Sequence, residues 1–145
     1  MALHILKLCV GCDSIEDLVE WRDQDAAWKR ANKLPVEQYH VTRMFPQRKG
    51  EILDGGSLYW VIKGNVQCRQ KIIDLRPVTG EDGIGRCQIV LEHAVIPTQW
   101  QPRRAFQGWR YMAHKDAPAD MTDGQKGLLE MPRELREELA SLGLL

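Results

Sequence analysis

The residue types best suited to chemistry crowd into residues 98–111, where cations and large aromatic rings alternate. Guanidinium groups bind phosphates and carboxylates through paired hydrogen bonds, and aromatic rings offer faces on which bases stack. A segment that only filled a core would not place so many cations among its largest apolar side chains. We therefore predict a surface for a flat, anionic partner. Its members are Trp100, Arg103, Arg104, Phe106, Trp109, Arg110 and Tyr111.

A basic strand is expected to join this surface, because Arg69 and Lys71 follow a predicted turn beside Lys63. Stacking of one base is worth about 1 to 3 kcal/mol, and phosphate contacts add a salt-dependent contribution. We expect the surface to bind RNA or a nucleotide, without chemistry and without a cofactor. An alternative stays open: the arginines could lie over core tryptophans as cation–π partners. The predicted nucleic-acid-binding residues are Arg69, Lys71, Trp100, Arg103, Arg104, Trp109, Arg110 and Tyr111.

The cysteines offer a second kind of chemistry. Cys9 and Cys12 stand between an expected strand and the start of an expected helix, where a helix N-terminus lowers a thiol pKa. A thiol redox enzyme is therefore one alternative function. A four-thiolate zinc site of Cys9, Cys12, Cys68 and Cys87 is a further alternative, although structural zinc sites usually use two close cysteine pairs. We expect no metal and four core thiols.

Acid–base catalysis is a third possibility, through His40, His93 or His114 with nearby carboxylates. Glu92 and His93 are neighbours, so on a strand they point to opposite faces. No serine stands in a nucleophile-elbow motif, which leaves only a hydrolase of unrecognised type. His93 falls on a mostly apolar strand face, and we expect a core histidine there.

Composition limits the class of protein. The chain has 145 residues, of which 43% are hydrophobic and 28% charged, as in a soluble globular domain with a real core. Its formal net charge is zero, so it lacks the strongly basic character of many nucleic-acid-binding domains, and anion binding must come from local clustering. No run approaches a membrane span or a signal peptide, so we expect a cytoplasmic protein without a membrane partner.

Local signals place these residues on secondary structure. The apolar run 3–10 predicts a buried strand, and the capping-box spacing of Asp13 and Glu16 predicts a helix from about residue 14 to 33. Gly64 and Asn65 can supply the positive φ angles of a tight hairpin. Residues 98–107 are expected to form a loop. Further strands are expected at 39–45, 58–62, 66–75, 85–96 and 108–113, and a closing helix at 128–144.

Hairpins outnumber strand–helix–strand units in this order, which favours a single α+β domain over residues 1–145. Its mainly antiparallel sheet should curl toward a barrel, with one helix near each end of the chain. Leu135, Leu139 and Leu142 form an apolar stripe on the closing helix, which we expect to dock onto the sheet. The same stripe, or residues 98–111, could instead bind a protein partner.

The residues at 6–18, 59–72, 103–112 and 116–120 resemble an uncharacterised bacterial family, seen mainly in alphaproteobacteria, over essentially the whole chain. This resemblance implies a cytoplasmic bacterial protein from a family of unknown function, without assigned catalytic residues. The strand–glycine–strand hairpin from Trp60 to Ile72 is also similar to that of PUA-like domains of the ASCH and EVE types. That likeness implies a small β-barrel with flanking helices that binds RNA or modified bases.

Overall fold

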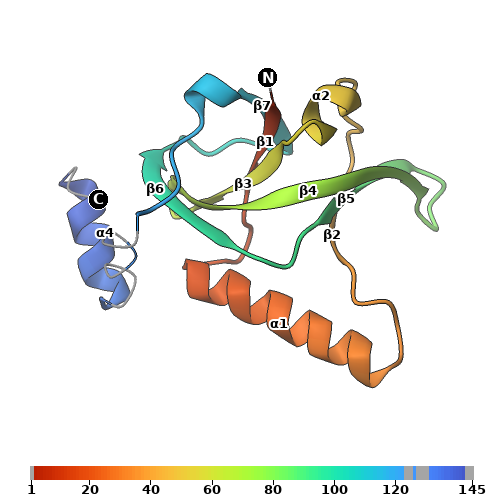
Figure 1. Ribbon diagram of the computed structural model, residues 1–145, viewed down its shortest axis with the longest axis horizontal. Helices are drawn as coiled ribbons and strands as arrows, with labels where there is room; N and C mark the ends of the chain where they lie inside the picture. Colours follow the sequence, from red (N-terminus) through yellow and green to blue (C-terminus); the bar gives the residue numbers. More distant parts are fainter. Residues whose placement is uncertain (1, 123–125, 127–130, 143–145) are drawn as a thin grey trace.

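The computed structural model describes residues 2–122, 126 and 131–142, and within them an α+β fold (Figure 1). A mostly antiparallel sheet is flanked by helices, as the sequence predicts. The strands are β1 (Leu3–Leu8), β2 (Gln38–Thr42), β3 (Ser57–Ile62), β4 (Asn65–Thr79), β5 (Gly85–Leu91), β6 (Ile96–Pro102) and β7 (Trp109–Ala113). The helices are α1 (Ile15–Ala31), α2 (Lys49–Leu53), the 3-10 turn η1 (His114–Asp116) and α4 (Arg133–Ser141).

The sheet runs in the order β2-β5-β4-β3-β1-β7, and β6 pairs with β4 beside this path. Only the β1–β3 pair is parallel among the described strands. The long strand β4 organises the sheet, because its first half pairs with β3 and β6 and its second half with β5. Since β2 and β7 are the two ends of the order, the sheet curls without closing into a barrel.

The β3–β4 hairpin confirms the predicted turn but moves its positive φ angles by one residue. Lys63 and Gly64 have φ of 51° and 80°, and Ile62 pairs with Asn65 across the turn. Two central residues with positive φ define the hairpin turn whose twist matches that of the strands. Asn65 is therefore the first residue of β4 rather than part of the turn.

Helix α1 begins one residue later than the predicted capping box. The Ser14 hydroxyl accepts from the Asp17 N–H at 3.3 Å, and the Asp17 carboxylate accepts from the Asp13 N–H at 2.9 Å. Ile15 and Leu18 are buried against the sheet. Ala26 near the other end is buried as well, while Trp28 is 59% exposed, so one side of the helix is covered and the other is not.

The core lies on both faces of the sheet, because side chains alternate along each strand. Ile5 and Leu58 belong to the larger cluster under α1 and α2, and their neighbours Leu6 and Tyr59 belong to a smaller cluster on the opposite face. Phe106, from the β6–β7 connection, packs against the smaller cluster. The sheet therefore presents two differently covered faces.

The strand predicted at 85–96 ends at Leu91, and a separate strand, β6, begins at Ile96. Non-local pairing carries β4 beyond its predicted end and creates β6. Strand β4 continues through Pro77, and β6 forms within residues that were expected to be a loop, with Pro97 opposite Cys68. A register shift between Ile72 and Asp74 leaves Ile73 exposed. Leu75 is completely buried as a result, although strict alternation from Ile72 would have turned it outward.

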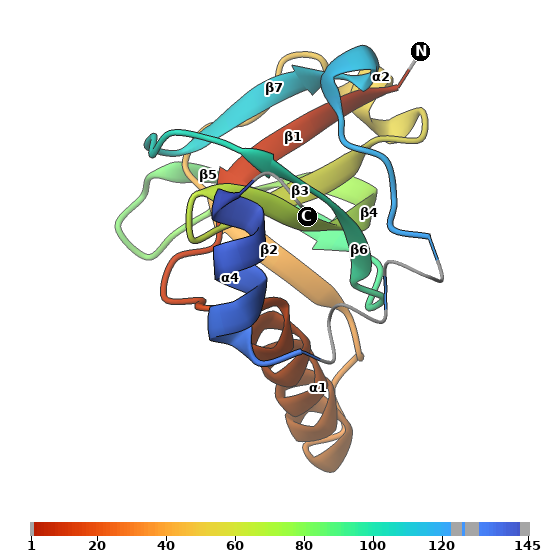
Figure 2. The ribbon, with the colours of Figure 1, turned by 90° about the vertical axis from the view of Figure 1, so that its left-hand side faces the viewer.

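Helix α4 stands beside β6 and the start of α1 (Figure 2). The Arg136 guanidinium pairs with the Glu16 carboxylate of α1, and Arg136 is buried. The predicted docking of the leucine stripe is wrong for two of its members, because Leu135 is 41% and Leu142 is 64% exposed. The predicted ends of this helix, 128–130 and 143–144, lie outside the described residues.

No helix among residues 2–122, 126 and 131–142 is long and apolar enough to cross a membrane.

Candidate functional site

Three of the predicted arginines come together on one face of the sheet. Arg103, Arg104 and Arg110 line a hollow of about 360 Å³ over the smaller core cluster. Strand β7 positions Arg110, and the end of β6 leads into the loop that carries the other two. Leu6 of β1 and Phe106 complete the apolar floor. We call Arg103, Arg104, Arg110 and Phe106 the arginine surface.

The charges of the arginine surface are not neutralised. Arg103 donates from Nε and Nη2 to the neutral Gln101 amide oxygen, at 3.2 and 2.7 Å. The Arg110 guanidinium lies 5.3 Å from the Phe106 ring centre. Within the described part of the chain, no carboxylate lies at ion-pair distance from these three arginines, whereas five other arginines have one. The five paired arginines are Arg48, Arg69, Arg76, Arg86 and Arg136.

Trp109 and Tyr111 lie on the other face of β7, because they alternate with Arg110. The Trp109 indole donates to the Met44 carbonyl at 2.7 Å, and its ring packs against the larger core cluster. The Tyr111 hydroxyl oxygen accepts from the backbone N–H of Gln47 at 3.0 Å. Both rings therefore hold the segment before α2 and point away from the arginine surface.

Trp100 occupies a third place, beside α4. It lines a hollow together with Glu137 and Ser141 of that helix, and its buried indole nitrogen has no hydrogen-bond partner among the described residues. Arg103, which is only three residues later, lies in a different hollow. The segment 98–111 is thus divided between separate surfaces.

Arg69 and Lys71 line a hollow of their own with His4, His114 and Asp120. The Arg69 guanidinium makes two 2.8 Å hydrogen bonds to the Asp120 carboxylate and a third to Ser57 Oγ. Its charge is therefore balanced, while Lys71 is exposed. This hollow lies on the same sheet face as the arginine surface, because His4 and Leu6 are two residues apart on β1.

The histidines form contacts that sequence alone does not predict. Buried His4 accepts from the Ser57 N–H through Nδ1, so neutral His4 carries its proton on Nε2 and donates to His114 Nδ1 at 3.0 Å. Burial, with the charges of His114 and Arg69, lowers the pKa of His4 to about 4. His93 was expected in the core, and this prediction is wrong: it is exposed and contacts Asp23 at 2.7 Å.

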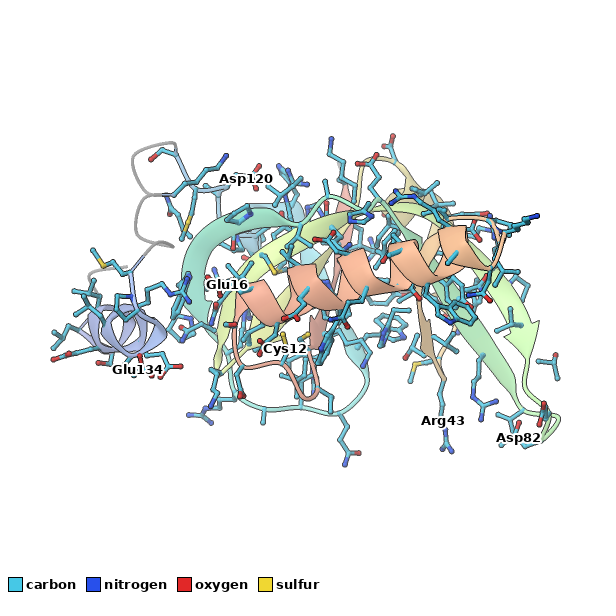
Figure 3. All side chains as sticks on the ribbon, turned by 90° about the horizontal axis from the view of Figure 1, so that it is seen from below. Cys12, Glu16, Arg43, Asp82, Asp120 and Glu134 are labelled. Carbon is cyan, nitrogen blue, oxygen red and sulfur yellow. The ribbon has the colours of Figure 1, made fainter. Side chains whose placement is uncertain are left out.

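All four cysteines are buried free thiols, and within the described ranges no cluster of metal-ligating side chains brings three or more together. Hydrogen bonding to Cys12 and burial raise the pKa of Cys9, while the same bond lowers the pKa of Cys12. Cys12 lies just before the first turn of α1 (Figure 3), and its thiol donates to the Ser14 carbonyl at 3.0 Å. Burial also raises the pKa of Cys87 to about 11. The geometry gives no support to a four-thiolate zinc site.

Sequence reasoning missed a hollow of about 350 Å³ between α1 and the sheet. Arg22 of α1, His40 of β2 and Trp60 of β3 line it, together with Cys9 after β1. The available signal was Arg22 itself, which stands four residues after buried Leu18 on the covered side of α1. We call this hollow the helix–sheet pocket.

The fold and its hollows define a small α+β protein with arginine-lined hollows on both faces of its sheet. The chain belongs to the family described as "Protein of unknown function (DUF1489)", whose family model matches residues 5–145. This confirms the resemblance to an uncharacterised family over the whole chain. The comparison with curated proteins and the comparison with solved structures each found no match.

Proposed function

We propose that this protein binds single-stranded RNA through the arginine surface, without chemistry. One observation carries the proposal: three arginines without carboxylate partners in the described structure gather on one hollow, in a chain whose net charge is zero. Guanidinium groups grip phosphates in pairs of hydrogen bonds. Uncompensated arginines that lie together are therefore suited to a polyanion.

Single strands suit this surface better than a duplex, because their bases are free to stack on aromatic rings or guanidinium planes. The Arg110 guanidinium lies over Phe106 and presents such a plane. The proposal is narrower than the expectation from sequence, since Trp109 and Tyr111 face the other side of the sheet. Lys71 extends the surface along the same face, while Arg69 is occupied by Asp120.

The proposal includes a PUA-like fold, a bacterial origin and a cytoplasmic location. The curled, mostly antiparallel sheet with flanking helices supports the PUA-like part. RNA binding is the function that this likeness implies.

Fluorescence anisotropy with a labelled single-stranded RNA tests the proposal, with the Arg103→Ala, Arg104→Ala, Arg110→Ala triple variant as the decisive protein. Loss of three charge-assisted contacts should weaken binding about a hundredfold at low salt. Each lost phosphate contact should also lower the slope of log affinity against log salt by about 0.7, so the triple variant should lose about 2 from that slope.

The matched control is Arg76→Ala, Arg86→Ala, which removes two half-buried, carboxylate-paired arginines from β4 and β5 near the hairpin tip, where Figure 3 shows Asp82. The RNA affinity of this control should stay within about twofold of wild type, because charges that are already paired at the surface contribute little to binding. Absence of RNA binding at low salt, or equal losses in the triple variant and the control, would overturn the proposal. Preference for single-stranded DNA of the same sequence would overturn the assignment to RNA.

A further inference from the structure

We propose that the helix–sheet pocket binds a small aromatic carboxylate, with Arg22 as the residue that holds the carboxylate group. This site is on the opposite side of the sheet from the arginine surface and is independent of RNA binding. It runs along α1 from Leu18 to Lys29, and this helix lies beneath the sheet in Figure 1.

Arg22 is a half-buried cation without a carboxylate partner in the described structure. Its Nε is buried and makes no hydrogen bond, and Nη1 reaches only the Gln38 side-chain oxygen and the Tyr39 carbonyl, both at 3.5 Å. Asp25, the acid that shares the pocket lining, pairs with Lys29 at 2.9 Å. A guanidinium removed from water and left without a counter-ion is costly, and a bound carboxylate would complete its hydrogen bonds.

Aromatic rings form the walls around this guanidinium. The Trp60 ring is 2% exposed and its centre lies 5.9 Å from the Arg22 guanidinium carbon. The His40 ring stands edge-on to Trp60, with centres 5.3 Å apart and an interplanar angle of 90°. Tyr39 and Trp21, which are 40% and 45% exposed, also line the pocket. These walls suit the flat apolar body of a ligand, since ring pairs prefer offset or edge-on contact.

The local charges favour an anion. Burial, together with the nearby positive charges of Lys7 and Arg22, lowers the pKa of His40 to about 4. Lys7, on β1, is half-buried and has no ion-pair partner in the described ranges. The charged groups that act on His40 are thus the cations Lys7 and Arg22. Asp25 pairs with Lys29, and its charge also partly offsets the lowering of the Arg22 pKa that burial causes.

The size of the pocket defines the ligand class further. A volume of about 350 Å³ is at the small end of ligand sites, so it suits one ring system and one acidic group. A planar carboxylate matches the planar guanidinium in two parallel hydrogen bonds. The chemistry that the pocket recognises is therefore a flat monoanion rather than a long or highly charged molecule.

Isothermal titration calorimetry with benzoate, indole-3-carboxylate and the neutral amide benzamide tests this site. Benzamide keeps the ring and removes the charge, so we expect it to bind at least about tenfold more weakly than benzoate. Arg22→Met should weaken benzoate binding by about tenfold or more, because it removes the guanidinium and keeps an apolar stem. Arg30→Met, on the exposed part of the same helix, is the matched control and should bind like wild type.

A second readout follows His40 by NMR. Benzoate should raise the pKa of the His40 imidazole, because a bound anion offsets the charges of Lys7 and Arg22. The titration of His40 is followed in the His93→Gln variant, because this substitution removes one overlapping histidine signal. The measurement does not depend on whether Arg22→Met folds, so the proposal stays testable in either case.

The results separate this site from the RNA proposal. Saturating benzoate should leave RNA anisotropy unchanged, and the arginine triple variant should bind benzoate like wild type. Equal binding of benzoate and benzamide, no heat with either carboxylate at millimolar concentration, or an unchanged Arg22→Met would overturn the carboxylate site. Tighter binding of adenosine monophosphate than of either carboxylate would overturn the assignment to a carboxylate.

Discussion

The arginine surface and the helix–sheet pocket use the same side chain in opposite ways. Arg104 and Arg110 are exposed beside half-buried Arg103, and they act as a group of hydrated charges. Arg22 is alone, half-buried among aromatic rings, and its Nε has lost water without gaining a partner. The first region suits a long, flexible polyanion, and the second suits one small anion.

This difference shows that the number of arginines is a poor guide to a binding site unless their partners are known. Arg69 was part of the predicted surface, but Asp120 already occupies its guanidinium. Arg22 has no such partner among the described residues. Solvent reduces the energy of each exposed charge, whereas burial makes a single unpaired charge important.

The largest expected effect is on the pH dependence of stability, which compares one histidine on each face. His4 and His40 are neutral in the folded protein down to about pH 4, while the unfolded chain takes up protons near pH 6.5. Their stabilisation is complete above pH 6.5 and is lost between 6.5 and 4, by up to about 3 kcal/mol for each histidine. Urea unfolding at several pH values measures this fall.

The variant His40→Phe should reduce that fall and leave the part due to His4. Benzoate should reduce the part of the fall that is due to His40, because it acts on the pocket alone. Equal losses of stability in wild type and His40→Phe between pH 6.5 and 4 would show that His40 does not contribute to the fall.

The second prediction contrasts a paired arginine with an unpaired one. Arg69→Met should lower the free energy of unfolding by about 1 to 2 kcal/mol, because Asp120 and Ser57 lose their partner. Arg22→Met should instead raise it by up to about 1 kcal/mol, because an unpaired, partly buried charge is replaced by an apolar chain. Chemical denaturation of the two variants gives both values, and a loss of stability in Arg22→Met would mean that Arg22 supports the fold.

The third prediction concerns salt. Three phosphate contacts at about 0.7 each predict that RNA affinity falls about twentyfold between about 50 and about 200 mM salt. Binding of benzoate by one guanidinium should fall by less than about threefold over the same range. Anisotropy and calorimetry at matched salt concentrations make the comparison, and parallel salt slopes would show that both ligands use the same kind of site.

The smallest effect is expected for Tyr111→Phe. Removal of the hydroxyl that accepts from the Gln47 and Arg48 N–H groups should cost about 1 kcal/mol of stability or less. Affinity for RNA and for benzoate should both stay at the wild-type level, because this ring faces neither site. A tenfold loss of RNA affinity would return Tyr111 to the binding surface.

Much of the fold was predictable where the cause is local. The hairpin at Lys63 and Gly64 follows from turn chemistry, and the start of α1 follows from its capping residues. The β6 strand was not predictable in the same way, because its pairing partner is the backbone of β4. The exposed Ile73 and buried Leu75 likewise follow from a register shift that pairing with β5 creates.

The candidate sites were predictable to a smaller extent. Alternation along β7 already implied that Arg110 and Tyr111 would part, but it could not show which one would join Phe106. Arg22 was the one signal of the pocket in the sequence, but the lining could not be predicted, because Leu18 and Arg22 of α1 meet His40 and Trp60 only when the helix packs on the sheet.

By itself, the sequence determined the α+β class, the tight turn, the helix cap and which residues carry charge, since these depend on neighbours along the chain. Only the tertiary structure decided which charges are free. The carboxylate that neutralises Arg69 lies 51 residues away, at Asp120, and no carboxylate among the described residues pairs with Arg103. Charge compensation is a through-space property, so folding decides which arginines remain able to bind a ligand.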